Sequence, residues 1–328
     1  MIINKLMDEI ESGGNAIPTL LPMLIDAQLA ANPDLSRMLS PQNIACVWGS
    51  TQLNVRSLPV AAWRAGKAGA INDGTVAATY RSSGTTSADR SATVLDENGL
   101  ALYAAAVRTG FTKTFGHSGE SIIALMPDVD SAPESSLSAM CHILGADFVF
   151  GEGWQERLIH LIENVNEPLI LFGTAFAWVH FLDASAGVIP LPSGSRLIET
   201  GGYKGKSREL PKANLYQALA QRFAISTDDI WSEYGMCELS SQFYSKGLGT
   251  RLVPSPSVRS LAINPITGTS CAPEEDGLLV HIDAANWCSY AVIETQDWGN
   301  VDAHGHIELK GRAPGASPKG CSIDADTA

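Results

Sequence analysis

The sequence predicts an α/β fold built from layered, mainly parallel sheets with helices, followed by a smaller β-rich section toward the C-terminus. Two patterns predict it. Between about residues 121 and 233, short apolar runs alternate with segments of helical periodicity. After about residue 250, strand-like runs follow one another with turn residues between them, which is typical of antiparallel strands. The length of 328 residues and the hydrophobic content of 45% allow a large buried core.

The first part of the chain is predicted to be helical. Residues 17–31 predict a helix whose packing face consists of Leu21, Leu24, Ile25 and Leu29. Residues 75–80 then predict a strand that leads into a loop rich in serine, threonine and glycine, and residues 100–108 predict a helix after it. A strand, such a loop and a helix in this order are the context expected of a phosphate-binding loop.

The middle of the chain predicts a parallel sheet. Strands are expected at residues 121–126, 147–150, 168–172, 196–200 and 229–233, and helices at residues 135–144, 154–164, 175–184 and 208–223. Strands separated by helices imply right-handed βαβ units. The later strands are expected at residues 277–283, 290–295 and 304–310.

These elements divide the chain into three expected parts: an N-terminal helical segment packed on the core (1–70), the core itself (71–312) and a short tail (313–328). The start of the chain has no basic region followed by an apolar run, and the longest apolar stretch, residues 169–182, is too short for a bilayer. The six cysteines are scattered and form no C-x-x-C pair. We therefore expect a cytoplasmic protein with reduced thiols and no membrane span.

The formal net charge of −13 argues against a nucleic-acid partner, which would favour clustered lysine and arginine. A nucleotide needs only a few local cations and backbone N–H groups. Residues 80–90 (YRSSGTTSADR) offer both, because hydroxyl side chains surround Gly84 and Arg90 follows them. Loops of this composition cradle phosphates, although ordinary flexible loops share it.

Four further loops follow predicted strands. They are residues 199–205 (ETGGYKG), 233–238 (EYGMCE), 296–299 (QDWG) and 311–312 (GR). In open α/β sheets, ligands bind at the carboxyl ends of the strands. Each loop also has a purely structural interpretation: a turn, a glycine loop with positive φ, or a carboxylate at a helix start.

Taken in order, these motifs resemble the adenylate-forming superfamily of acyl-CoA synthetases, peptide-synthetase adenylation domains and luciferases. Residues 82–87 (SSGTTS) resemble its phosphate loop, and residues 234–238 (YGMCE) resemble its Y-G-x-T-E motif. Asp297 resembles its ribose-binding aspartate, and Gly311-Arg312 resembles the G-R at its hinge. Within the superfamily the chain is most similar to LuxE-type acyl-protein synthetases, from about residue 70 to the C-terminus. That similarity rests on residues 172–176 (FGTAF), 199–205, 234–243 (YGMCELSSQF) and 319–322 (KGCS).

The resemblance implies a nucleotide site and its cofactors, ATP and Mg²⁺, with CoA as a further candidate. The implied nucleotide-binding residues are Ser82, Ser83, Gly84, Thr85, Thr86, Gly201, Gly202, Tyr203, Tyr234, Gly235, Met236, Cys237, Asp297 and Arg312. Among them the phosphate loop holds the phosphates, the glycine pair approaches the adenine, Tyr234 stacks on it, and Asp297 and Arg312 reach the ribose. Glu238 is the implied Mg²⁺ ligand, since a hard cation prefers carboxylate oxygen.

The sequence departs from the family pattern at several positions. Ser87 stands where the phosphate loop usually has glycine, Asp89 adds a negative charge nearby, and Cys237 replaces the threonine of Y-G-x-T-E. The chain also ends soon after Arg312, so we expect the superfamily's small C-terminal domain, with its lysine, to be absent, as it is in LuxE-type proteins. Lys204 and Arg90 are then the candidates for the catalytic cation.

The expected activity is acyl activation. A carboxylic acid and MgATP would give an acyl-AMP, and a thiol would then take the acyl group. The resemblance points to Cys321 as that thiol. A thioester would pass the acyl group onward to an accepting protein, either a carrier protein or a reductase.

Two alternatives remain open at this level. The departures at residues 87, 89 and 237 favour a transacylase that has lost adenylation and moves an acyl group from CoA or acyl-AMP through Cys321 to a carrier protein. The other alternative is a non-catalytic protein that binds a nucleotide or an acyl group, in which Cys321 would be a simple tail thiol.

Overall fold

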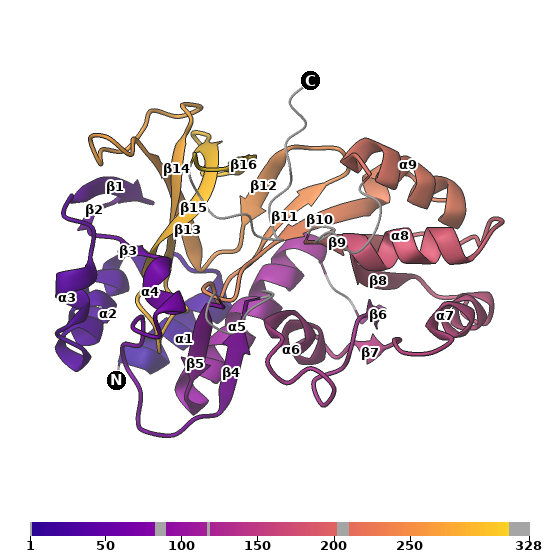
Figure 1. The fold of residues 1–328 in the computed structure, drawn as a ribbon, viewed down its shortest axis with the longest axis horizontal. Helices are drawn as coiled ribbons and strands as arrows, with labels where there is room; N and C mark the ends of the chain where they lie inside the picture. The colour runs from indigo at the N-terminus through magenta and orange to yellow at the C-terminus, as the bar shows by residue number, and fades with distance from the viewer. Residues whose placement is uncertain (1, 83–89, 117–118, 202–209, 315–328) are drawn as a thin grey trace.

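The computed structural model describes residues 2–82, 90–116, 119–201 and 210–314 (Figure 1). Its helices are α1 (Ile2–Ser12), α2 (Ile17–Ala31), α3 (Leu35–Met38), α4 (Ala61–Arg64), α5 (Glu97–Phe115), α6 (Ser136–Ile143), α7 (Trp154–Glu163), α8 (Ala175–Ala184) and α9 (Lys212–Phe223). Its strands are β1 (Ile44–Trp48), β2 (Thr51–Val55), β3 (Leu58–Pro59), β4 (Ala78–Arg81), β5 (Ala92–Leu95), β6 (Ser121–Leu125), β7 (Asp147–Phe148), β8 (Leu169–Thr174), β9 (Arg196–Thr200), β10 (Ile230–Tyr234), β11 (Phe243–Lys246), β12 (Arg251–Pro254), β13 (Val258–Ile263), β14 (Gly277–Asp283), β15 (Val292–Val301) and β16 (Ile307–Arg312).

The predicted parallel strands form one half of a large sheet. Strands β7, β6, β8, β9 and β10 lie side by side and run parallel. Their apolar side chains alternate between two cores, as strand geometry requires. Ile170 and Phe172 of β8 join the core under α5 and α6, whereas Leu169 and Leu171 join the core under α7, α8 and α9. Helices therefore cover both faces (Figure 1).

The predicted β-rich section continues the same sheet. Strands β13, β14, β15 and β16 pair antiparallel in that order, and β12 joins β16 to β11 and β10. Among the described residues this makes one mixed sheet of 12 strands, counting β3 beside β15. The two halves predicted from the sequence thus form one continuous sheet. Strands β11 and β12, which connect the halves, were not predicted from the sequence.

The N-terminal helices pack on this core. The predicted helix over residues 17–31 is α2, and Leu21 and Leu24 on its predicted face are fully buried. Gln28 of α2 is also fully buried, donates to the carbonyl oxygens of Asn286 and Ser289 at 2.6 and 2.7 Å, and accepts from the Ala291 N–H. One polar side chain therefore ties α2 to the β14–β15 connection. The division of the chain near residue 70 stays a prediction.

The loop after residue 82 lies between two strands, which corrects the expected order of strand, loop and helix. β4 and β5 pair antiparallel, with Tyr80 opposite Thr93, and α5 begins only after β5. Strand β5 was missed because Ala92–Leu95 has only four residues, of which Thr93 is polar, and such a short run gives little periodicity. Helix α1 and the hairpin of β1 and β2 also had no sequence prediction. Among the described residues, none of the helices has the length and apolarity needed to cross a bilayer.

Candidate active site

One cavity of about 790 Å³ opens at the carboxyl ends of the parallel strands, where such sheets bind ligands. Its walls come from segments far apart in the sequence. They include Leu125 at the end of β6, Thr174 at the end of β8, Thr200 and Gly201 at and just after the end of β9, Glu233 and Tyr234 at the end of β10, Asp297 of β15 and Arg312 of β16. The parallel and the antiparallel halves of the sheet therefore both contribute to it.

The structure brings ten of the predicted site residues to this cavity: Ser82, Arg90, Gly201, Tyr234, Gly235, Met236, Cys237, Glu238, Asp297 and Arg312 all line it. Eight others lie outside the described residues, namely Ser83, Gly84, Thr85, Thr86, Gly202, Tyr203, Lys204 and Cys321. Placement in one cavity does not assign a role, so the roles of all of them remain predictions.

Asp297 is the centre of a polar network on one wall. Its Oδ1 accepts from Arg312 Nη1 at 2.7 Å, and its Oδ2 accepts from the Tyr234 hydroxyl at 2.9 Å. Arg312 Nη2 also donates to Gln296 Oε1 at 2.9 Å. A carboxylate offers about four acceptor positions, so two accepted bonds leave Asp297 with capacity for further donors.

Local backbone geometry sets up this pair. Asp297 and Arg312 are partners across β15 and β16, and the register shifts just beyond them, between Trp298 and Gly299. A Cβ at Gly299 would lie 2.1 Å from the Glu308 carbonyl oxygen, so only glycine permits this close approach. The bulge thus depends on the glycine of the QDWG motif.

The ring of Tyr234 is held in place by neighbouring side chains. It packs against Phe243 and His281 with centroid distances of 5.5 and 5.8 Å. His281 Nε2 lies 3.3 Å from the Tyr234 hydroxyl, and its Nδ1 lies 2.8 Å from Ser260 Oγ. Burial lowers the pKa of His281 to about 3, so this imidazole is neutral at neutral pH. The orientation of Tyr234 is therefore fixed by packing and by hydrogen bonds.

Glu238 is the candidate metal ligand. It is only 2% exposed, lines the cavity, and its Oε2 lies 3.3 Å from Cys237 Sγ. Its backbone is anchored, because Thr93 donates to the Cys237 carbonyl at 2.7 Å and Asn286 donates to the Glu238 carbonyl at 2.8 Å. Among the described residues no three His, Cys, Asp or Glu side chains form a metal cluster. A single carboxylate nevertheless fits Mg²⁺, which commonly takes one or two carboxylates and completes its shell with phosphates and water.

Arg90 lies shortly after the predicted phosphate loop in the sequence. Its Nε donates to the Ser82 carbonyl at 2.7 Å, while the Ser91 N–H donates to Ser82 Oγ at 2.9 Å. Glu134 lies between two cations, with its carboxylate oxygens 2.7 Å from Arg81 Nε and 3.7 Å from Arg90 Nη1. An incoming anion would therefore compete with Glu134 for both guanidinium groups.

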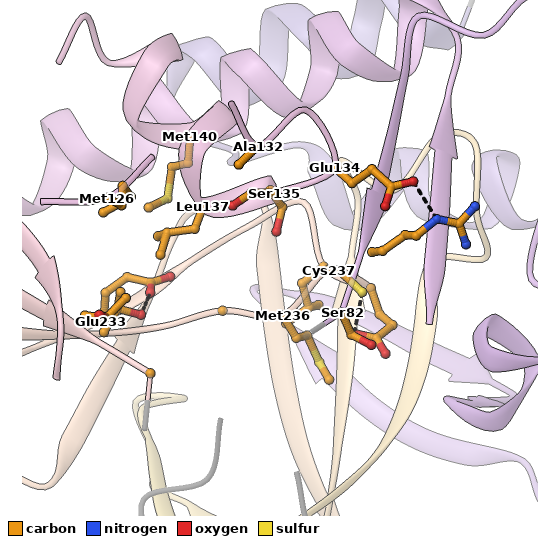
Figure 2. A pocket seen from close by; sticks show the side chains of 18 of the residues that line it. Ser82, Met126, Ala132, Glu134, Ser135, Leu137, Met140, Glu233, Met236 and Cys237 are labelled. Carbon is orange, nitrogen blue, oxygen red and sulfur yellow. Dashed lines mark hydrogen bonds and ion pairs between the residues drawn. The ribbon is translucent and has the colours of Figure 1, made fainter. Parts of the chain in front are cut away.

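The opposite part of the cavity is apolar. Met126, Leu137 and Met140 gather on one side of it in Figure 2, and Phe150 and Phe176 also line it. Leu137 and Met140 come from α6, whose first turn is capped by Ser135 Oγ accepting from the Ser138 N–H at 3.1 Å. We call the wall formed by Met126, Leu137, Met140, Phe150 and Phe176 the apolar lobe.

Two buried glutamates lie near the ends of β9 and β10. Burial raises the pKa of both Glu199 and Glu233 to about 7. Glu199 faces away from the cavity, toward the hydroxyls of Tyr216 and Ser232 at 3.4 and 3.3 Å. Glu233 lines the cavity, and its Oε2 accepts a hydrogen bond from the Thr200 hydroxyl.

Sequence reasoning assigned no role to several residues of this cavity. They are Arg64, Arg81, Glu134, Glu233 and Gln296. One signal was available for Glu233, because a charged residue in a predicted strand that also contains Ile230 and Trp231 needs an explanation. No comparable signal marked Glu134 or Arg64, which lie in segments without a motif.

Comparison with solved structures identifies the fold. MatB from Rhodopseudomonas palustris with ATP bound superposes with a TM-score of 0.54 at 14% identity, covering 74% of this chain and 50% of that one. A luciferase-like enzyme from the nonluminescent mealworm Zophobas morio gives 0.53 at 17% identity, covering 76% and 60%. MenE, the O-succinylbenzoate coenzyme A synthetase of Bacillus subtilis in complex with AMP, gives 0.52 at 16% identity, covering 74% and 50%.

These similarities show the fold of adenylate-forming enzymes, as the sequence predicted. At such low identity they show the fold alone. The matched part of this chain spans between 50% and 60% of the length of those three proteins. No protein-family model matches the chain, and no curated protein sequence matches it.

Proposed function

We propose that this protein is an acyl-activating enzyme similar to LuxE-type acyl-protein synthetases. It would form an acyl-AMP from a carboxylic acid and ATP, and pass the acyl group to a cysteine thiol and then to an accepting protein. The observation that carries the proposal is the convergence of Ser82, Tyr234, Glu238 and Asp297, which come from three distant segments of the chain, on one cavity. Proteins with this fold have been solved with ATP, with AMP and, in MenE, with an acyl-adenylate intermediate.

In this proposal the nucleoside lies against the β10 and β15 side of the cavity. The Tyr234 ring presents an aromatic face to the adenine, and Asp297 accepts from the ribose hydroxyls. Arg312 holds Asp297 in place through their 2.7 Å ion pair. The predicted phosphate loop, which begins at Ser82, donates to the phosphates.

Glu238 would hold Mg²⁺, which when bound supplies positive charge beside the phosphates. The catalytic cation in this proposal is Arg90 or Lys204. Arg90 is the one of the two that the structure describes, and it would exchange its 3.7 Å contact with Glu134 for the phosphate.

The chemistry then has two steps. A substrate carboxylate oxygen attacks the α-phosphorus, and the bond to pyrophosphate breaks, which leaves an acyl-AMP. The Cys321 thiolate next attacks the acyl carbonyl carbon, and AMP leaves, which gives a thioester. Lys319 would favour the thiolate, and an acyl-accepting protein would take the acyl group from it.

Carboxylate-dependent exchange of pyrophosphate into ATP, measured without CoA, tests the first step. We expect exchange with some member of a panel of carboxylic acids, and a loss of about tenfold or more in Asp297→Asn, which removes a charged acceptor. Glu308→Gln on β16 is the matched control, since it changes a carboxylate outside the cavity and should retain exchange. Absence of exchange with every acid would contradict adenylation.

Intact-mass measurement after incubation with MgATP and the active acid tests the second step. We expect a covalent acyl adduct that maps to Cys321 and is lost in Cys321→Ala, while exchange remains. Full acyl transfer by Cys321→Ala would remove the covalent step from the proposal.

A transacylase is the second candidate. Cys237 favours it, because a thiol 3.3 Å from the Glu238 carboxylate stands where a hydroxyl donor to the α-phosphate is expected. Acyl-CoA turnover without pyrophosphate exchange would support this candidate, and labelling by no acyl donor would leave a non-catalytic binding protein.

A further inference from the structure

Glu233 places a carboxyl group beside the apolar lobe. It is the second-last residue of β10, and side chains alternate along a strand. Tyr234 therefore points toward Asp297 and His281, while Glu233 points to the α5 and α6 face of the sheet. Figure 2 shows Glu233 on the side of Met126 and Leu137, apart from Ser82 and Cys237.

Glu233 is buried, and few charged groups surround it. It is 6% exposed, and the side chains of Tyr103, Cys141 and Tyr244 lie close enough to interact with it electrostatically. In the described part of the chain, the only other charged group that acts on it is Glu199, on the neighbouring strand. Among the described residues it forms no ion pair with lysine or arginine, so no opposite charge there offsets the cost of its burial.

One carboxylate oxygen of Glu233 remains available. Oε2 accepts from the Thr200 hydroxyl, and among the described residues no donor is hydrogen-bonded to Oε1. Gly235 makes room for Oε1, since a Cβ at that position would lie 2.6 Å from it. A second acceptor lies on the same cavity: Gln242 is 4% exposed, and its Oε1 has no hydrogen-bond partner within the described ranges.

Buried acceptors without a donor are costly, and in native proteins most of them are satisfied by protein, water or ligand. The acceptor position at Glu233 Oε1 stays open on the cavity side. It lies beside the apolar lobe, whose side chains would contact an acyl chain. We propose that the acid substrate carries an amino or hydroxyl group remote from its carboxylate, and that Glu233 accepts a hydrogen bond from that group. This inference rests on the proposed function, because it names the substrate class of the same site.

Matched acids test the inference. The probes are unbranched alkanoates from butanoate to decanoate and, at each length, the ω-amino and ω-hydroxy analogues. Binding to the protein is measured by titration calorimetry without ATP, and pyrophosphate exchange is measured in parallel. We expect an analogue with a donor to bind about tenfold or more tightly than the alkanoate of equal length, as a hydrogen bond to a charged group allows.

Two variants locate the effect. In Glu233→Gln the preference for the donor should fall to about threefold or less, while alkanoate binding is retained. Glu199→Gln is the matched control, because it neutralises an equally buried carboxyl on the next strand that faces away from the cavity. This control should keep the preference of the unmodified protein. Comparing the amino with the hydroxyl series shows which donor is used.

The outcomes separate the inference from the proposed function. Equal binding of donor and alkanoate by the unmodified protein, or a preference unchanged in Glu233→Gln, would overturn the inference even if exchange occurs. Binding that prefers the donor through Glu233 without any exchange would support the inference as a statement about the pocket and contradict adenylation. Absence of binding by every acid would overturn the inference.

Discussion

Single carboxyl groups behave differently here according to what surrounds them. Asp297 has a guanidinium partner at 2.7 Å. Asp283 is fully buried, but it accepts from the N–H groups of Ser240 and Ser241 at 2.8 and 2.9 Å and thereby holds the segment that follows Glu238. Burial raises the pKa of Asp283 to about 6 in spite of these bonds. Glu233 has fewer hydrogen-bond partners than Asp283, and burial raises its pKa to about 7.

The protonation of Glu233 predicts a pH-dependent stability. Burial raises its pKa from 4.5 to about 7, so between these values the folded protein binds more protons than the unfolded chain. The free energy of unfolding then falls as pH rises through this range. Glu233→Gln removes that loss. From about pH 5 to about pH 8, the free energy of unfolding of this variant should therefore rise by up to about 3 kcal/mol relative to that of the unmodified protein. Urea denaturation at both pH values measures the difference.

Tyr244→Phe is the control for this experiment. Tyr244 lies beside Glu233 across β10 and β11, is fully buried, and its hydroxyl has no hydrogen-bond partner among the described residues. Removing that hydroxyl changes no charge near neutral pH and should leave the pH dependence as it is. A pH dependence that is identical in Glu233→Gln and the unmodified protein would show that Glu233 is ionised throughout.

At the scale of elements, helix α5 packs against a segment that positions part of the cavity wall. Gly110 of α5 approaches the connection between β12 and β13 so closely that a Cβ would lie 2.2 Å from Ser255 Oγ. Ser255 cannot move freely, because it donates to the Gln242 carbonyl at 2.6 Å, and Gln242 lines the cavity. The close contact of α5 thus fixes part of the cavity wall.

Gly110→Ala should therefore destabilise the protein, although alanine is the better helix former by about 1 kcal/mol. Overpacking at such a contact costs about 1–3 kcal/mol, so we expect a net loss of roughly 1 kcal/mol in thermal or urea unfolding. Thr112→Ala, at an exposed position of the same helix, should be neutral or slightly stabilising. A stabilised Gly110→Ala would mean that Ser255 can move away at little cost.

At the scale of the whole molecule, the cavity depends on the joining of two half-sheets. Thr200 and Tyr234 come from the parallel half, and Asp297 and Arg312 come from the antiparallel half. The pairing of β12 with β16, through Leu252 opposite Ile307, connects them. A ligand that contacts both halves binds only the folded protein and stabilises it by mass action.

We therefore expect ATP with Mg²⁺ to raise the midpoint of thermal unfolding. At a ligand concentration one hundred times Kd, the added free energy is about 2.7 kcal/mol. Chelating Mg²⁺ should reduce the shift, and Glu238→Gln should make the shift insensitive to chelation. Arg312→Met should weaken the shift both with and without Mg²⁺, because it loses a contact to the nucleoside side. No shift at millimolar ATP would argue against a nucleotide site.

Local patterns in the sequence determined much of the fold. The periodicity of residues 17–31, 175–184 and 196–200 predicted α2, α8 and β9 with their observed bounds, because each buries side chains at its own regular spacing. The carboxyl ends of the parallel strands also identified the location of the cavity. Motifs with unusual composition, such as EYGMCE and QDWG, marked Tyr234 and Asp297 as candidate site residues, and both line that cavity.

Tertiary structure alone decided how these pieces meet. The joining of both half-sheets through β12 and β16, the Tyr234–Asp297 hydrogen bond, and the pairing of Arg81 and Arg90 with Glu134 all link residues far apart in the chain. Periodicity reports which face of an element is buried, but not which other element buries it. For the same reason the sequence could not show that Glu233 borders the apolar lobe, since burial and the partners of a side chain arise only when distant segments pack together.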